Sequence, residues 1–244
     1  MHHTLSLIVL VFAAEAAYRQ SDLALLADFD DPADPLRDRS GRGNHLVPEH
    51  VEWATDVRDG YLSFRRGTAA RVCTPPGLLA RDDGALTLCM RYRVRATSTS
   101  ALNAALRAAP EWLLTVHPER VHLAGSIHIS AHYLRPLAFV HADNGCSYQP
   151  WDVEAATSDT SPFTQVCVAW SRGADTGQAF VRVSVDGRVS AERHQSCLRA
   201  MPPLFGPETY FCLGAVDSER HAVDVDVDLF AVWNATLVDD DDLE

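Results

Sequence analysis

The feature that most constrains this sequence is a two-residue alternation of apolar and polar side chains. In residues 85–95, ALTLCMRYRVR, every second side chain is apolar, and the opposite face carries a row of arginines, Arg91, Arg93 and Arg95. In residues 222–233, AVDVDVDLFAVW, the odd-numbered residues are all apolar and the first half of the other face is aspartate. Such alternation is typical of β-strands that bury one face and expose the other. The aspartate face is expected to be solvated, because neighbouring aspartates about 6.7 Å apart are too distant to share one metal ion.

A hairpin is predicted in residues 179–192, AFVRVSVDGRVSAE, where alternation continues on both sides of Asp186-Gly187. Asp-Gly favours a two-residue type I′ turn, because both central positions need positive φ. One or two helical turns are expected only at residues 100–108. Further strands are expected at residues 23–29, 61–64, 112–116, 120–124, 126–130, 136–141, 164–170 and 209–214. Many short strands separated by turns predict an all-β fold, an antiparallel sandwich of two sheets.

The N-terminus contains an apolar run over residues 5–14, followed by Ala14-Glu15-Ala16. This pattern is typical of a signal peptide and its cleavage site. We expect residues 1–16 to be removed and residues 17–244 to form a single domain, since no linker or change of composition divides them. No later stretch reaches 18 uninterrupted apolar residues, so no transmembrane segment is expected. The mature chain is expected to be secreted and extracellular.

Six cysteines are present: Cys73, Cys89, Cys146, Cys167, Cys197 and Cys212. They allow fifteen disulfide connectivities, and no CxxC spacing suggests zinc or redox chemistry. Cys89 and Cys167 fall on the polar faces of their predicted strands, so they can face each other across one sheet. Cys197 and Cys212 could close the proline-rich loop between them. That choice leaves Cys73 to pair with Cys146.

The formal charge of −12 argues against nucleic acid and anionic membranes as partners. All 21 basic residues are arginine. A GC-rich genome would produce this usage without any functional role for the arginines. The row Arg91, Arg93 and Arg95 could bind sulfate, sialate or carboxylate groups bidentately. The negative charge of the chain and its exclusive use of arginine instead favour the interpretation that this row binds no ligand. The sequon at Asn234 offers a site for an N-linked glycan.

Several segments together resemble known families. LADFD followed by Asp38-x-Ser40-Gly41-x-Gly43-Asn44 resembles the opening strand and turn of laminin G-like domains. The segments ALTLCMRYRV, FTQVCVAWSRGADTGQAFVRVSVDG, YFCLGAVDS and VDLFAVWNATLVDDDDLE resemble, in the same order, strands of pentraxins. The resemblance covers about two-thirds of the mature chain. It implies a concanavalin A-like jelly-roll sandwich of the laminin G or pentraxin type, with a Cys89–Cys167 disulfide.

The glycines Gly41 and Gly43 lie in a polar turn, DRSGRGN. A phosphate-binding loop would lead into a helix, whereas this turn leads into HLVPEH, which is not a helical sequence. We expect a structural corner in which the glycines supply positive φ and Asp38 or Ser40 caps backbone N–H groups. A corner that holds calcium is the alternative.

Calcium is the ligand that the pentraxin resemblance implies. Pentraxins bind it through an Asp-Asn pair and through a Glu-Gln-Asp group after a Leu-Gly strand. This chain has Asp143-Asn144, and only Asp217 follows Leu213-Gly214. Because calcium prefers six to eight oxygen ligands, the two-ion site is expected to be lost. The candidates for a single weak calcium site are Asp143, Asn144, Asp217 and Asp38, and no other cofactor is expected.

Motifs of catalysis are absent from the sequence. It contains no HExxH or GxSxG motif, and no Glu-x-Asp-x-x-Glu pattern of jelly-roll glycosidases. The resemblance to pentraxins and laminin G-like domains implies a secreted, lectin-like, non-catalytic binding module for glycans or extracellular protein surfaces. Two alternatives stay open: a jelly-roll glycosidase or polysaccharide lyase with an unrecognised site, and a structural ectodomain or virion glycoprotein without a small ligand.

Overall fold

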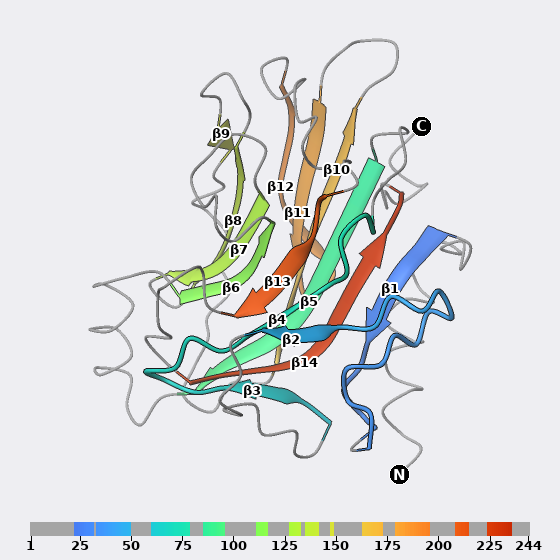
Figure 1. Ribbon diagram of the computed structural model, residues 1–244. Coiled ribbons are helices and arrows are strands. Elements are labelled where there is room, and N and C mark those ends of the chain that lie inside the picture. Colours follow the sequence, from blue (N-terminus) through green and yellow to red (C-terminus); the bar gives the residue numbers. More distant parts are fainter. Residues whose placement is uncertain are drawn as a thin grey trace.

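The computed structural model is an antiparallel β-sandwich of two sheets over the residues that it describes (Figure 1). These are residues 22–31, 33–49, 60–78, 85–95, 111–116, 127–132, 135–141, 147–148, 163–172, 179–195, 208–214 and 224–235. Within these ranges, no helix has the length and hydropathy that a membrane crossing requires. The all-β class expected from the alternation is therefore confirmed.

Sheet 1 contains the long alternating strands. Its order is β1 (Leu23–Ala27), β14 (Asp224–Trp233), β5 (Ala85–Arg95), β10 (Thr164–Arg172), β11 (Ala179–Val185) and β12 (Arg188–Gln195). A short strand, β3 (Leu62–Phe64), pairs with the first part of β14, while β1 pairs with its second part. The central pair β5–β14 therefore has strands on both sides.

Sheet 2 is assembled from shorter strands. Its order is β2 (Val47–Glu49), β4 (Arg71–Cys73), β13 (Phe211–Gly214), β6 (Glu111–Val116), β7 (Ile127–His132), β8 (Arg135–His141) and β9 (Ser147–Tyr148). Figure 1 shows β13, β4 and β2 crossing in front of β5 and β14 of sheet 1. The sequence pattern did not predict β2, β4 and β9, which are too short to show an alternation.

The core lies between the two sheets. From β5 it takes the side chains on the apolar face of the alternation, including Leu88, Met90 and Tyr92, which are all fully buried. Sheet 2 contributes Phe211 and Leu213, which are also fully buried. Burying one such side chain stabilises the fold by about 1.5–3 kcal/mol. The apolar stripe of the alternation is therefore the main source of the sandwich's stability.

The predicted Asp186-Gly187 turn is confirmed. It joins β11 to β12, and its two residues have φ of 49° and 74°. Positive φ at both positions is the requirement of a type I′ turn. Of the remaining predictions, residues 100–108 and 120–124 lie outside the described residues.

The sequence pattern correctly predicted which side chains of β14 face the core in the first half of the strand, but not in the second half. Val227 pairs with Tyr92 of β5, but Phe230 rather than Leu229 pairs with Met90, because the register shifts by one residue at Asp228. A β-bulge of this kind reverses the facing of every later residue. Ala231 and Trp233 consequently lie on the outer face, packed around Cys89. The outer face of sheet 1 is thus apolar around Cys89 and polar beyond the bulge.

Each sheet carries one disulfide between directly paired strands. Cys89 of β5 is bonded to Cys167 of β10, as expected. Cys212 is bonded to Cys73, which lies directly opposite it in the β13–β4 pair. The expected pairs Cys197–Cys212 and Cys73–Cys146 are therefore wrong, because strand pairing rather than proximity in the sequence brought the partner to Cys212. Cys146 and Cys197 themselves lie outside the described residues.

Candidate functional site on the outer face of sheet 1

The turn DRSGRGN is built around the carboxylate of Asp38, which is 4% exposed. Its Oδ1 accepts hydrogen bonds from the backbone N–H groups of Leu26 (3.0 Å) and Ser40 (2.8 Å). Its Oδ2 accepts from the Ser40 hydroxyl (2.8 Å) and the backbone N–H of Asn44 (2.9 Å). Gly41 and Gly43 have φ of 83° and 78°, as expected for a tight corner.

This arrangement supports the structural corner over the corner that holds calcium. Burial disfavours the charge on Asp38, but the hydrogen bonds from Leu26, Ser40 and Asn44 outweigh it and hold the pKa of Asp38 below its usual value. Four donors occupy the acceptor positions of the carboxylate, so none is left for a cation. Across the described residues, no group of three or more His, Cys, Asp or Glu side chains could hold a metal ion. Asp143, Asn144 and Asp217 lie outside them.

The arginine row of β5 lies beside the aspartates of β14. Arg91 forms a bidentate pair with Asp228, with Nε–Oδ1 and Nη2–Oδ2 distances of 2.7 Å each. Burial raises the pKa of Asp228, although the hydrogen bonds and charge of Arg91 act in the opposite direction. The side chain of Asp228 is 12% exposed and that of Arg91 is 22% exposed. This pair is therefore a closed, charge-balanced unit.

The next two arginines share one carboxylate. Arg93 Nε lies 2.8 Å from Asp226 Oδ2, and Arg95 Nη2 lies 3.1 Å from Asp226 Oδ1. The hydroxyl of Ser63 on β3 also donates to Oδ1 at 2.6 Å. Asp226 is fully buried, so the expectation that the aspartate face is solvated is wrong at this position. The cause is that β3 and the arginines of β5 flank the aspartate on both sides.

Two aromatic rings hold the guanidinium of Arg93 in place. The Cζ atom of Arg93 lies 4.9 Å from the ring centroid of Tyr61 and 4.7 Å from that of Phe163. The two ring centroids are 6.1 Å apart, and the ring planes are inclined by 51°. Cation–π contacts of this kind contribute about 0.5–1 kcal/mol each at exposed sites. Arg93 is therefore fixed by a carboxylate and two rings together.

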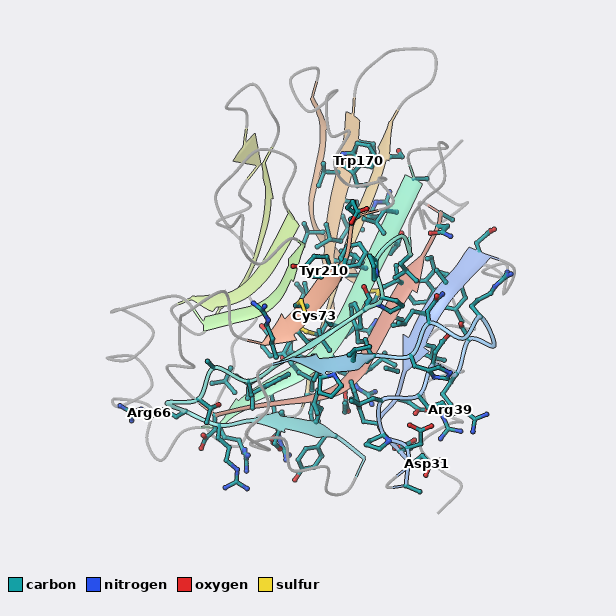
Figure 2. All side chains as sticks on the ribbon, in the orientation of Figure 1. Asp31, Arg39, Arg66, Cys73, Trp170 and Tyr210 are labelled. Carbon is teal, nitrogen blue, oxygen red and sulfur yellow. A yellow bond between two sulfur atoms is a disulfide. The ribbon has the colours of Figure 1, made fainter. Side chains whose placement is uncertain are left out.

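Arg66 completes the group at the end of β3. Its backbone N–H donates to Asp224 Oδ1 at 2.8 Å, and Asp224 lies directly opposite Arg95 in the β14–β5 pair. Figure 2 shows Arg66 at the edge of the molecule, on the opposite side of the view from Asp31 and Arg39. We call Tyr61, Arg66, Arg93, Arg95 and Phe163 the arginine–aromatic patch.

The sequence predicted part of this patch. The arginine row of β5 was a candidate anion site, and in the structure Arg91 is paired with Asp228 whereas Arg93 and Arg95 share Asp226. The matching periods of arginine and aspartate could have indicated that the two strands are neighbours, because opposite charges favour cross-strand pairing. Tyr61 and Phe163 come just before their strands and carry no local signal of their role.

No protein-family model matches the sequence, and no curated protein matches it. Solved structures with a similar fold include the binding domain of Paraclostridial Mosquitocidal Protein 1, with a TM-score of 0.67 and 10% identity over 91% of this chain. The binding domain of botulinum neurotoxin DC, in complex with rat synaptotagmin II, matches with a TM-score of 0.63 and 7% identity over 92% of this chain.

A further similar structure is that of botulinum neurotoxin type C, whose cell entry depends on interaction with two ganglioside molecules; it has a TM-score of 0.61 and 8% identity over 91% of this chain. The chain spans about half the length of these structures, which it covers to 51%, 51% and 50%. At such low identity the similarity establishes the fold alone. That fold is an all-β sandwich of two sheets, and the similarity does not single out the pentraxin or laminin G type.

Proposed function

We propose that this protein is a secreted, non-catalytic binding module that recognises glycans or protein surfaces outside the cell. The observation that carries the proposal is the arginine–aromatic patch on the outer face of sheet 1, which is partly exposed and in which Asp226 and two rings hold Arg93 in place. Fixed side chains lose little conformational entropy when a ligand binds, which favours affinity. The jelly-roll sandwich of the concanavalin A type is part of the same proposal.

Two further observations support a binding role outside the cell. Each sheet contains a cross-strand disulfide, and disulfides persist in oxidising compartments, in agreement with the signal peptide expected at residues 1–16. The structures with similar folds include a botulinum neurotoxin binding domain in complex with rat synaptotagmin II, and botulinum neurotoxin type C, whose cell entry depends on interaction with two ganglioside molecules. The shared fold alone is a weak indication of function, so the patch is the stronger support.

The proposal is tested by binding of the oxidised protein to a glycan array, and to a panel of intact cells before and after removal of their glycans or their surface proteins. Binding that is lost after deglycosylation would identify a glycan ligand, and binding that is lost only after protease treatment would identify a protein ligand. Absence of binding to the array and to all of the cells would contradict the proposal. Release of sugar fragments from the array would indicate an enzyme instead.

A further inference from the structure

We propose that the arginine–aromatic patch binds the single carboxylate or sulfate group of an acidic sugar, an inference that rests on the proposed binding function and assigns it a site. The arginines of β5 differ in how they are paired with carboxylates. Arg91 has a carboxylate of its own, whereas Arg93 and Arg95 share Asp226 between them, and the Ser63 hydroxyl donates to Asp226 as well. One carboxylate cannot use all the donors that surround it.

The unused donors are specific. Only Nε of Arg93 and Nη2 of Arg95 contact Asp226, and within the described part of the chain no other partner contacts these two guanidiniums except the two rings. A guanidinium offers five N–H donors. The side chain of Arg66 forms no contact with another described residue, since its only hydrogen bond comes from the backbone N–H. The patch therefore presents several N–H donors that are available to a ligand.

The local charge has the sign that an anion needs. The patch contains three guanidiniums, from Arg66, Arg93 and Arg95, and the carboxylates beside it are those of Asp224 and Asp226. Three positive and two negative charges leave one positive charge. The chain as a whole has a formal charge of −12, so this local excess stands against an acidic background. Such a background repels a polyanion at long range, whereas a ligand with one negative charge experiences mainly the local field.

The exposure and rigidity of these groups fit a small anionic ligand. The side chain of Arg95 is 44% exposed and that of Arg93 is 31% exposed, so both can be reached from solvent. Arg93 is already held by Asp226 and the two rings. A planar guanidinium fixed in this way binds a carboxylate or sulfate without first losing its own freedom. The half-buried rings of Tyr61 and Phe163 add apolar surface beside the anion, as the C–H groups of a sugar ring require.

The test compares three small probes that share one lactose core: lactose alone, lactose with a terminal sialic acid, and lactose with a single sulfate. We expect both acidic probes to bind in isothermal titration calorimetry and lactose to bind at least tenfold more weakly. The stronger of the two acidic probes identifies the carboxylate or the sulfate as the preferred group. A longer, heparin-like polyanion is expected to bind no more tightly than the better single-charge probe.

The variants are Arg66→Gln and Arg95→Gln, each of which removes a partly exposed guanidinium and leaves the pair of Arg93 and Asp226 in place. Each is expected to weaken binding of the acidic probe about tenfold or more, the usual effect of losing one charge-assisted hydrogen bond. The matched control is Arg37→Gln, which removes the same charge from the exposed turn near Asp38, away from the patch. It should leave the affinity unchanged, and all three variants should melt within a few degrees of the wild-type protein.

Failure of this inference can be distinguished from failure of the proposed function. If the wild type binds the acidic probe and both patch variants bind equally well, the inference is overturned and the binding function stands. If the wild type binds only other glycans or proteins, the same conclusion follows. Binding that is strongest for the polyanion, or for an acidic peptide with no affinity for acidic sugar, would also overturn it. A protein that binds nothing in any of these arms contradicts both.

Discussion

Two buried carboxylates, Asp38 and Asp226, organise different parts of this molecule in different ways. Asp38 is 4% exposed and is surrounded by backbone N–H groups and one hydroxyl, which fill its acceptor positions. Asp226 is fully buried and is held by two arginines that keep unused donors. The first arrangement is closed, and it fixes the chain. The second is open on the arginine side, and it can accept a ligand.

The comparison shows that burial of a charge does not by itself distinguish a structural residue from a functional one. The partners decide. The donors around Asp38 are neutral, and three of the four are backbone N–H groups, so they bring no charge to the corner that a ligand could pair with. The charged partners of Asp226 bring more donors and more charge than the carboxylate can use, and their exposure makes that excess accessible.

The largest effect on stability is expected from Asp38→Ala. The substitution leaves the N–H groups of Leu26, Ser40 and Asn44 without an acceptor, and each unsatisfied group costs about 1–3 kcal/mol when it is buried. These groups are only partly buried, so we expect a total loss of about 3 kcal/mol. Urea unfolding measures it, with the exposed Asp34→Ala as control. A loss below that of the control would show that the corner does not depend on this carboxylate.

A smaller loss is expected from Asp226→Ala. Arg93 and Arg95 are 31% and 44% exposed and can turn toward water when the aspartate is removed, so only Ser63 loses a buried partner. We expect about 2 kcal/mol in the same unfolding measurement, below the loss from Asp38→Ala. A larger loss of stability than from Asp38→Ala would reverse the comparison, because the region around Asp226 would then contribute more to stability than the corner around Asp38.

A loss of about 1 kcal/mol is expected from Gly43→Ala. Gly43 has φ of 78°, a conformation that disfavours a Cβ atom, but no other atom lies within 4 Å of the place where that Cβ would stand. The cost is therefore one of backbone strain alone. Affinity for an acidic sugar should be unchanged per folded molecule. Loss of affinity in a stably folded Gly43→Ala protein would give the corner a role in binding.

The smallest expected effect is on how the free energy of unfolding changes with pH in the acid range. The pKa of Asp38 is held below its unfolded value of about 3.8 by its hydrogen bonds. Its contribution is therefore present above that value and lost as the pH falls through the folded pKa. Asp228 is the opposite case, because burial raises its pKa, and its contribution is lost as the pH rises.

Unfolding at a series of pH values from 5 to 2 separates the two carboxyl groups. Asp38→Asn should flatten the loss of stability toward acid pH, relative to the wild type. Asp228→Asn should steepen it. If the free energy of unfolding changes equally with pH in the wild type and both variants, the pKa values of Asp38 and Asp228 are not shifted in the directions described.

Much of the fold, and a smaller part of the site, could be predicted from the sequence. The alternation in residues 85–95 and the Asp186-Gly187 turn led correctly to strands and a hairpin, because both depend on local geometry. The facing of Phe230 and the partner of Cys212 were missed, since a bulge and a strand pairing are properties of two segments at once. Tyr61 and Phe163 were missed for the same reason. They become a site only where β3 and β10 bring them to Arg93.

We infer that the arginine–aromatic patch is open to anions, whereas the corner around Asp38 is closed. Nuclear magnetic resonance tests it most directly, by following the Nε–H signals of Arg66, Arg93 and Arg95 and the backbone N–H signals of Leu26, Ser40 and Asn44 in one titration with the acidic sugar. We predict that the arginine signals shift with saturation while the corner signals stay in place, and that calcium moves neither set. Corner signals that shift while the arginine signals stay in place would contradict the claim.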